Sequence, residues 1–366
     1  MLFKFNLFKK ASKISAGLDI YPGGFCVASV SKENGKYVLE NFAFNYFEEN
    51  VFQNGMITKP DIFAQTLRKT LDENNFDIKS VNVCISSNTM FSKIITFPDL
   101  PPEELKLIAP QEAAKHVPLT INEINVDFQI LENTKKENRV DIIICALSKA
   151  IARNLVESVA KAGLETDSVD VGSFAMIRTL ANAEMINNPD LSYISVLIGY
   201  ENTDINIVKN GMPVFSHNIQ TGKKNILEAV MKGFGLSREE AEKRLPEFSL
   251  IIPGTETPSD PDLNKASNLT KNIYGNIASE IQKTVEFYTS QSGEALEPEL
   301  IILGGIGVCI GNIDKYISNK LKIQTALCES LKNISYKPEL SKNKISSLNI
   351  PALATSIGLA LKGSEN

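Results

Sequence analysis

IILGGIGVCIG, residues 301–311, is the segment that most constrains the fold of this 366-residue chain. Its short apolar run predicts a buried strand, and Gly304-Gly305-x-Gly307 predicts a tight turn that leads into a helix. Glycines let a backbone pass close to a flat or anionic ligand, and a helix N-terminus adds a favourable dipole. Tight turns also need glycine without any ligand, so the cluster alone leaves both interpretations open.

Two β-meanders with the same turn signal begin the two halves of the chain. In the first, Asn34-Gly35 separates expected strands within 17–30 and 37–44. In the second, Asn210-Gly211 follows expected strands at 193–200 and 203–208 and precedes one at 213–220. Asn-Gly favours a type I′ hairpin because both central positions have positive φ. The repeat predicts two structurally similar lobes, the second beginning near residue 190.

Hydrophobic periodicity predicts the remaining elements. Helices are expected at 61–74, 148–161, 267–290 and 351–362, and strands at 81–86, 91–97, 124–131 and 140–147. Ser237 with Glu240 three residues later forms a capping box that begins another helix. Pro110 predicts two helices within 102–116, because proline removes a backbone hydrogen bond and clashes with the preceding turn. Residues 246–264, rich in proline, serine and threonine, predict a surface loop.

Composition narrows the class of protein. Hydrophobic residues make up 43% and charged residues 22%, and the net charge is −5 with no basic block, which argues against nucleic acid as a partner. The five cysteines contain no CxxC pair, so buried thiols in a reducing compartment are expected. No apolar run reaches the ~18–20 residues of a membrane span. The leader at 1–13 alternates apolar residues with lysines, which is typical of a membrane-surface or partner-binding segment and equally of a frayed or locally packed one.

Further glycine-bearing turns stand at equivalent places in the repeat. Residues 19–24 bend the first hairpin, residues 198–203 bend the second, and Gly222 leads from a strand into a helix. Facing turns can clamp a polyphosphate through their backbone N–H groups. The two histidines, His116 and His217, lack metal-ligand or triad spacing, and the sequence contains no phosphate-loop, HExxH or GxSxG motif.

The order of these motifs resembles the actin-like ATPase superfamily. The segments that carry the resemblance are GLDI at 17–20, the hairpin at 195–219, TG at 221–222, AE at 241–242, IILGGIG at 301–307 and PALATSIGLAL at 351–361. Two longer segments, at 96–131 and 162–180, resemble the PilM family of type IV pilus assembly proteins, which are relatives of the division protein FtsA. The resemblance covers nearly the whole chain.

The resemblance implies an α/β actin-like fold with ATP and Mg²⁺ between two RNase H-like lobes. The lobes would span 14–190 and 191–366, with an inserted subdomain at about 81–166 in the first. Carried over by position, Gly23 and Gly24 would lie near the phosphates on the first hairpin, and Gly199 and Asn202 on the second. Asp19, Thr203 and Gly222 would also bind the cofactor, with Asp19 holding the metal. Glu242 would face the ribose, and Gly304, Gly305 and Gly307 the adenosine. Ala354 and Gly358 would let the last helix cross a neighbouring element closely.

Several positions depart from the family pattern. Where the family has small hydroxyl residues and a lysine after its first Asp-Ile-Gly, this chain has Tyr21, Pro22 and Cys26. Leu197 replaces an acid in the second turn, and Leu245 replaces the ribose-motif lysine, with Arg244 one place early. Because Mg²⁺ takes carboxylate and water oxygens, these changes predict nucleotide binding with weak or no hydrolysis.

The function that the resemblance implies is a cytoplasmic scaffold at the inner face of the cytoplasmic membrane. The inserted subdomain and the adjoining first lobe would hold the N-terminal cytoplasmic peptide of PilN, with the PilN–PilO platform and a pilus motor ATPase as further partners. Three alternatives stay open: an active ATPase that couples hydrolysis to assembly, an FtsA-like filament former, and a small-molecule kinase. The kinase needs a catalytic aspartate that faces a substrate pocket; Asp204 is the nearest candidate, and the sequence gives it no supporting motif. The sequence shows no FtsA-type C-terminal amphipathic helix, which argues against the filament former.

Overall fold

The computed structural model describes residues 14–364 apart from short gaps, so the leader at 1–13 lies outside the described residues. The gaps are 48–50, 86–89, 137, 187, 189–190, 253, 255–258, 294–295, 337–339 and 341–344. The chain forms two compact units: the first runs to Ala175 and includes 214–216 and residues from Ser356 onward, and the second comprises 176–213 and 217–355. None of the helices in the described ranges combines the length and apolar content needed to cross a bilayer.

The first unit is built on a sheet whose strands follow the order β10-β6-β1-β2-β3. The strands are β1 (Ile14–Tyr21), β2 (Gly24–Glu33), β3 (Lys36–Tyr46), β6 (Ser80–Ile85) and β10 (Glu165–Asp170). β1, β2 and β3 form the predicted antiparallel meander, with Asn34 and Gly35 at positive φ, and β6 runs parallel to both β1 and β10.

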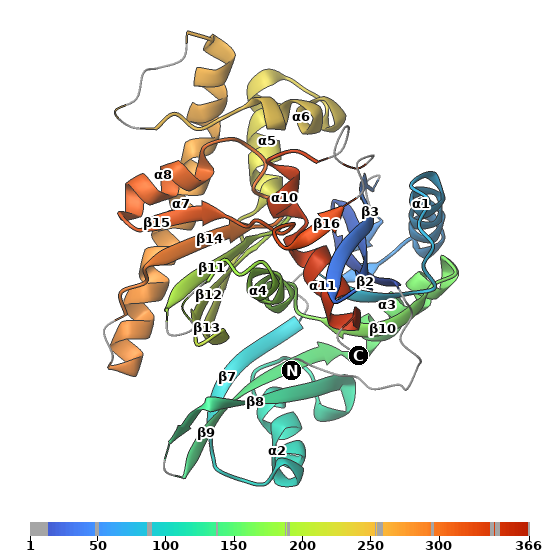
Figure 1. Ribbon diagram of the computed structural model, residues 1–366, viewed down its shortest axis with the longest axis vertical. Helices are drawn as coiled ribbons and strands as arrows, with labels where there is room; N and C mark the ends of the chain where they lie inside the picture. The colour runs from blue at the N-terminus through green and yellow to red at the C-terminus, as the bar shows by residue number, and fades with distance from the viewer. Residues whose placement is uncertain are drawn as a thin grey trace. The chain divides into compact units, whose positions relative to one another are not determined.

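Strand alternation divides this sheet into an apolar and a polar face. On one face, Leu18, Phe25 and Val83 pack against helices α1 (Pro60–Glu73) and α3 (Lys149–Lys161). The opposite face is covered by α11 (Ala354–Ser364), as Figure 1 shows. The helix approaches closely because a Cβ on Gly17 would lie only 2.6 Å from Leu359 Cβ. Close approach of α11 to β1 therefore depends on a glycine in the strand.

A separate three-stranded sheet, in the order β7-β9-β8, forms an insertion within the first unit. Its strands are β7 (Met90–Pro98), β8 (Ile124–Lys136) and β9 (Arg139–Ser148), and α2 (Pro102–Ala114) packs on one face. The prediction of two helices here is wrong: α2 continues through Pro110. Leu105, Ala109 and Ala113 recur every four residues and are buried against the sheet. This packing offsets the hydrogen bond that the proline removes.

The second unit repeats the arrangement of the first, with strands in the order β13-β12-β11-β14-β15. The strands are β11 (Tyr193–Ile198), β12 (Thr203–Lys209), β13 (Met212–Ile219), β14 (Leu300–Gly304) and β15 (Gln324–Leu327). Helices α5 (Lys223–Phe234), α7 (Pro261–Ser292) and α8 (Ile313–Leu321) contribute to the core with Ile194, Val196 and Ile301. As in the first unit, a meander is extended by strands parallel to its first strand. The predicted repeat of two similar sheets is confirmed.

Three element boundaries differ from those expected. The loop predicted to extend to residue 264 ends earlier, because the Asp260 side chain caps α7 and Pro261 occupies its first turn. The helix after the glycine turn begins only at Ile313, and the final helix is divided into α10 (Asn349–Ala352) and α11. The capping box at Ser237 is confirmed as the start of α6 (Arg238–Arg244). The remaining short elements are β4 (Phe52–Gln53), β5 (Met56–Ile57), η2 (Ile121–Glu123), α4 (Gly172–Asn182), η3 (Leu245–Glu247) and β16 (Ile334–Tyr336).

Candidate functional site

In the second unit, three predicted glycine turns meet at the end of β11. Gly199 N–H donates to Asn202 O at 2.8 Å and closes the turn between β11 and β12. Lys223 N–H, directly after Gly222, donates to Gly199 O at 3.0 Å. Gly307 N–H donates to Ile198 O at 2.8 Å. Residues 199, 222 and 307, far apart in sequence, therefore lie together at one edge of the sheet.

The glycines in these turns are required by the packing of the chain against itself. A Cβ on Gly222 would lie 2.6 Å from Tyr200 O, and one on Gly305 would lie 2.8 Å from Leu197 Cδ1. Gly305 also has φ +94°, a conformation that favours glycine. A Cβ on Gly304 would lie 2.8 Å from Met176 Cε. Turn geometry accounts for these residues without a ligand.

The backbone N–H groups of these turns already have intramolecular acceptors. Besides the bonds of Gly199 and Gly307, Gly222 N–H donates to Asn225 Oδ1 at 3.0 Å, and Gly305 N–H donates to Pro351 O at 2.8 Å. A helix dipole directly after Gly307 was also expected, but α8 begins only at Ile313. The cofactor-binding role of these glycines stays a prediction, and in this conformation these four N–H groups are not available as donors to a ligand.

Two further residues of the predicted set hold the same turns in place. Thr203 Oγ1 donates to Thr221 O at 2.7 Å, which ties the start of β12 to the segment before α5. Asn202 is buried, and its carbonyl accepts the Gly199 N–H. Both residues therefore have a structural role in the turn cluster.

Glu242 lies on α6 and forms a buried ion pair that the sequence did not reveal. Its Oε2 is 2.6 Å from Lys223 Nζ, and the two side chains are 8% and 9% exposed. Its Oε1 is also buried and has no hydrogen-bond partner in the described part of the chain. A buried acceptor without a donor is unfavourable. An incoming hydroxyl, such as that of a ribose, would satisfy it.

In the first unit, Asp19 lies in a row of polar side chains on the face covered by α11. Strand register aligns Asp170, Cys84, Asp19 and Cys26 on β10, β6, β1 and β2. Cys84 Sγ donates to Asp19 Oδ1 at 3.1 Å, and burial raises the pKa of the Asp19 carboxyl from 3.8 to about 6. A bound cation would relieve this penalty. Among the described residues, no group of three or more His, Cys, Asp or Glu side chains could hold a metal ion.

The turn at Gly23 and Gly24 is closely packed, and so are Cys26 and Leu197, two of the residues that depart from the family pattern. A Cβ on Gly24 would lie 2.9 Å from Tyr46 Cα, and Gly23 O accepts from Phe47 N–H at 3.0 Å. Cys26 Sγ lies 3.2 Å from Ser356 Oγ on α11. Leu197 is buried beside Gly305. Asp19, Gly23 and Gly24 belong to the first unit and the other predicted site residues to the second.

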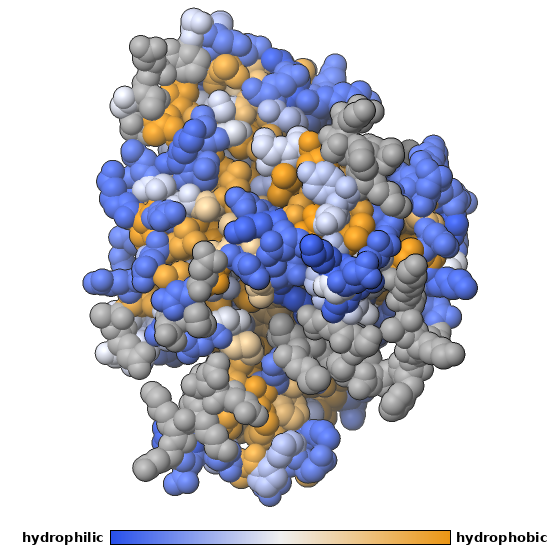
Figure 2. Space-filling view, in the orientation of Figure 1, coloured by the Kyte–Doolittle hydropathy of each residue, from blue (hydrophilic) through white to orange (hydrophobic). Residues whose placement is uncertain are grey.

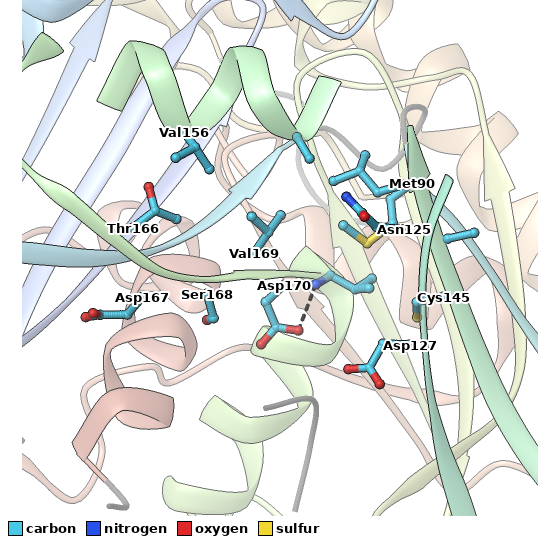
Figure 3. Close-up of a pocket in the computed structure, with 14 residues that line it drawn as sticks. Met90, Asn125, Asp127, Cys145, Val156, Thr166, Asp167, Ser168, Val169 and Asp170 are labelled. Atoms are coloured by element: carbon cyan, nitrogen blue, oxygen red, sulfur yellow. Dashed lines mark hydrogen bonds between the residues drawn. The ribbon is translucent and has the colours of Figure 1, made fainter. Parts of the chain in front are cut away.

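The first unit also contains a pocket of about 200 Å³ that no sequence motif indicated (Figure 3). It lies between the small sheet, β10 and α3. The lining residues are Met90, Asn125, Asp127, Cys145, Ala146, Leu147, Ala152, Val156 and 166–171. Figure 2 shows hydrophobic side chains over the small sheet. The polar members of the lining include Asn125, Asp127 and Asp170. The pocket therefore combines an apolar wall with a few polar groups, as ligand sites usually do.

The outermost strand of the first unit's main sheet forms one side of this pocket. β10 stands at the end of the strand order, and its residues line the pocket without a break from Thr166 to Asp170. Its pairing with β6 is irregular between Thr166 and Ser168. Asp170 Oδ1 accepts the Val171 N–H at 2.8 Å (dashed in Figure 3). The pocket is thus bordered by the edge of a β-sheet.

Comparison with known proteins shows similarity over almost the full chain. A family model described as "Type IV pilus assembly protein PilM" matches residues 17–364. The solved structure of a PilM-PilN type IV pilus biogenesis complex is similar with a TM-score of 0.83 and 21% identity, over 98% of this chain and 100% of that one. Ethanolamine utilization protein EutJ from Carboxydothermus hydrogenoformans is similar with a TM-score of 0.55 and 13% identity, over 95% and 89%. The predicted actin-like ATPase fold is confirmed.

Proposed function

This chain belongs to the type IV pilus assembly protein PilM family, and we propose that it is a cytoplasmic scaffold of the pilus assembly platform. The N-terminal cytoplasmic peptide of PilN would hold it at the inner face of the membrane, next to PilO and within reach of the pilus motor ATPase. The similar solved structure is a complex of PilM with PilN, which supports PilN as the partner. The observation that carries the proposal is the pocket between β10, α3 and the small sheet.

The pocket suits an extended peptide. The edge of β10 offers backbone N–H and C=O groups along one side, and edge strands recruit extended segments by β-augmentation. Met90, Val156 and Val169 supply apolar surface for side chains that alternate along such a segment. Affinity would come from the main chain and specificity from the side-chain contacts.

A surface substitution tests the placement of the peptide. Val156 lines the pocket from α3 and is 41% exposed, so Val156→Asp should fold normally and weaken binding of the PilN N-terminal peptide at least tenfold, by about 1.4 kcal/mol or more. Leu107→Asp is the matched control, because Leu107 is 71% exposed on α2 and does not line the pocket. Fluorescence anisotropy with a labelled peptide measures both. Equal affinity of Val156→Asp and the unchanged protein would exclude this pocket.

The proposal includes nucleotide binding with weak or no hydrolysis. Glu242 Oε1 would accept a ribose hydroxyl, and Asp19 would contribute a carboxylate to hydrated Mg²⁺. A bound Mg²⁺–ATP would supply a phosphoryl group held by a divalent cation. Weak hydrolysis is expected because Leu197 stands where the family has an acid.

A calorimetric titration of the protein with ATP in the presence of Mg²⁺ tests the proposed nucleotide binding. Glu242→Gln should weaken binding, since one carboxylate oxygen becomes an amide and the charge that holds Lys223 is lost. Phosphate release that depends on Mg²⁺ and disappears in Asp19→Asn would instead support the active-ATPase alternative. No binding of ATP at any concentration would remove the nucleotide from the proposal and leave the peptide scaffold standing.

A further inference from the structure

One end of the pocket carries two carboxylates from facing elements. Asp127 lies on β8 and Asp170 on β10, and Figure 3 shows both side chains at the same end of the pocket. No lysine, arginine or histidine belongs to the described lining of the pocket. Helix α11 brings a cation to this end: Lys362 Nζ lies 3.1 Å from Asp170 Oδ2.

The ion pair between Lys362 and Asp170 is enclosed, with side chains that are 9% and 0% exposed. Breaking such a pair would leave a buried charge without a counter-ion, so Lys362 is held at Asp170. One lysine neutralises one carboxylate. The acidic end of the pocket therefore keeps a net negative charge, which resides on Asp127.

Asp127 is placed to receive a cation. Its Oδ1 accepts the N–H of Phe128 at 2.9 Å, and it forms no ion pair within the part of the chain that the structure describes. Burial raises the pKa of its carboxyl, while the Phe128 N–H and Lys362 oppose the rise. Cys145, its register partner on β9, is buried and lines the same pocket. A half-buried carboxylate beside an apolar wall interacts more strongly with a cation than a fully exposed one does.

A metal ion is a poor candidate for that cation. Among the described residues, no cluster of three or more acidic, histidine or cysteine side chains is arranged to hold one. An organic ammonium or guanidinium needs only one carboxylate and tolerates apolar surroundings along its carbon chain.

Building on the proposed function, we infer that Asp127 binds a positively charged group of the docked peptide, either its α-amino group or a lysine or arginine side chain. Lys362 fixes Asp170 and so leaves room for a single ligand cation. The apolar wall and the β10 edge bind the rest of the segment. Charge recognition at Asp127 thereby sets the register of the peptide along β10.

The test compares Asp127→Asn with the unchanged full-length protein, using the PilN N-terminal peptide as the probe. Asparagine has nearly the same shape and can still accept the Phe128 N–H. We expect about tenfold weaker binding at low ionic strength and a smaller difference at high ionic strength. Asp77→Asn is the matched control, because Asp77 is an exposed aspartate of the first unit that does not line the pocket. Its affinity should stay within about twofold of the unchanged protein.

Modified peptides give a second measurement that leaves the protein intact. In one peptide the N-terminus is acetylated, and in each of the others one lysine or arginine is replaced by methionine. The peptide that lacks the recognised cation should bind the unchanged protein more weakly, and should show no such loss with Asp127→Asn. Equal binding by Asp127→Asn, or no loss with any modified peptide, would overturn the inference alone. Failure of the unchanged protein to bind the peptide would overturn the proposed function instead.

Discussion

Replacing Asp19 by asparagine should stabilise the protein at neutral pH, although it removes a hydrogen-bonded charge. Burial raises the pKa of this carboxyl from 3.8 to about 6, which makes its ionised form less favourable in the folded state by about 3 kcal/mol. The side chain keeps some contact with solvent, which reduces the expected effect to about 2 kcal/mol. An asparagine oxygen can still accept the Cys84 thiol, so the geometry of the row is retained.

The sign of the pH dependence follows from linkage. Because the folded pKa lies above the unfolded one, the contribution of Asp19 to stability is fully present below about pH 4 and is lost as the pH rises through about 6. The free energy of unfolding of Asp19→Asn should therefore equal that of the unchanged protein near pH 4 and exceed it by about 2 kcal/mol above pH 7.

Urea denaturation across this pH range, in buffer with a metal chelator, measures the difference. Asp77→Asn is a suitable control, because Asp77 is exposed and its change should shift the free energy of unfolding by less than about 0.5 kcal/mol. A difference between Asp19→Asn and the unchanged protein that is independent of pH, or a loss of stability above pH 7, would refute the reasoning. If the ionised Asp19 carboxylate destabilises the folded protein in this way, its presence is consistent with a role in binding a ligand.

Three further substitutions test the packing described above. Gly17→Ala should lower the free energy of unfolding by about 3 kcal/mol, because its Cβ would collide with Ser356 O on α11; a thermal midpoint equal to that of the unchanged protein would show that the helix does not rest on β1. Lys223→Met should lower the free energy of unfolding by about 3–5 kcal/mol, because it leaves the buried Glu242 carboxylate without its counter-ion. Adding Glu242→Gln to this variant should restore most of the lost stability. If urea denaturation instead shows that the two losses add, the residues are not a coupled pair. Ser237→Ala should cost about 1 kcal/mol at the start of α6, and urea denaturation that shows no loss would mean the capping box contributes nothing.

Local signals predicted much of the fold. Asn34-Gly35 and Asn210-Gly211 located both hairpins, because few other residue pairs tolerate two consecutive positive φ angles. The error at Pro110 has the opposite origin. Packing of the helix against the small sheet outweighs a local preference, and the partner strands lie further along the sequence.

The candidate sites were less predictable, since they depend on contacts between distant residues. Turn glycines were located correctly from sequence, but the atoms that exclude a side chain, such as Tyr200 O beside Gly222, could be identified only from the fold. The pocket had no motif of its own, and only the family resemblance pointed to a peptide site on the inserted subdomain and the adjoining first lobe. Asp127, Asp170 and Lys362 belong to three elements far apart in the chain, and each is ordinary within its own segment.

The discontinuous first unit has a consequence for biosynthesis. As the ribosome extends the chain, α1 and α3 become available to cover the apolar face of the main sheet long before α11 is made. The opposite face, with Asp19 and Asp170, stays uncovered until α11 is synthesised, which happens only after the entire second unit. We therefore expect the second unit to fold first, and the first unit to depend on its final helix to bring Ser356 to Cys26 and Lys362 to Asp170.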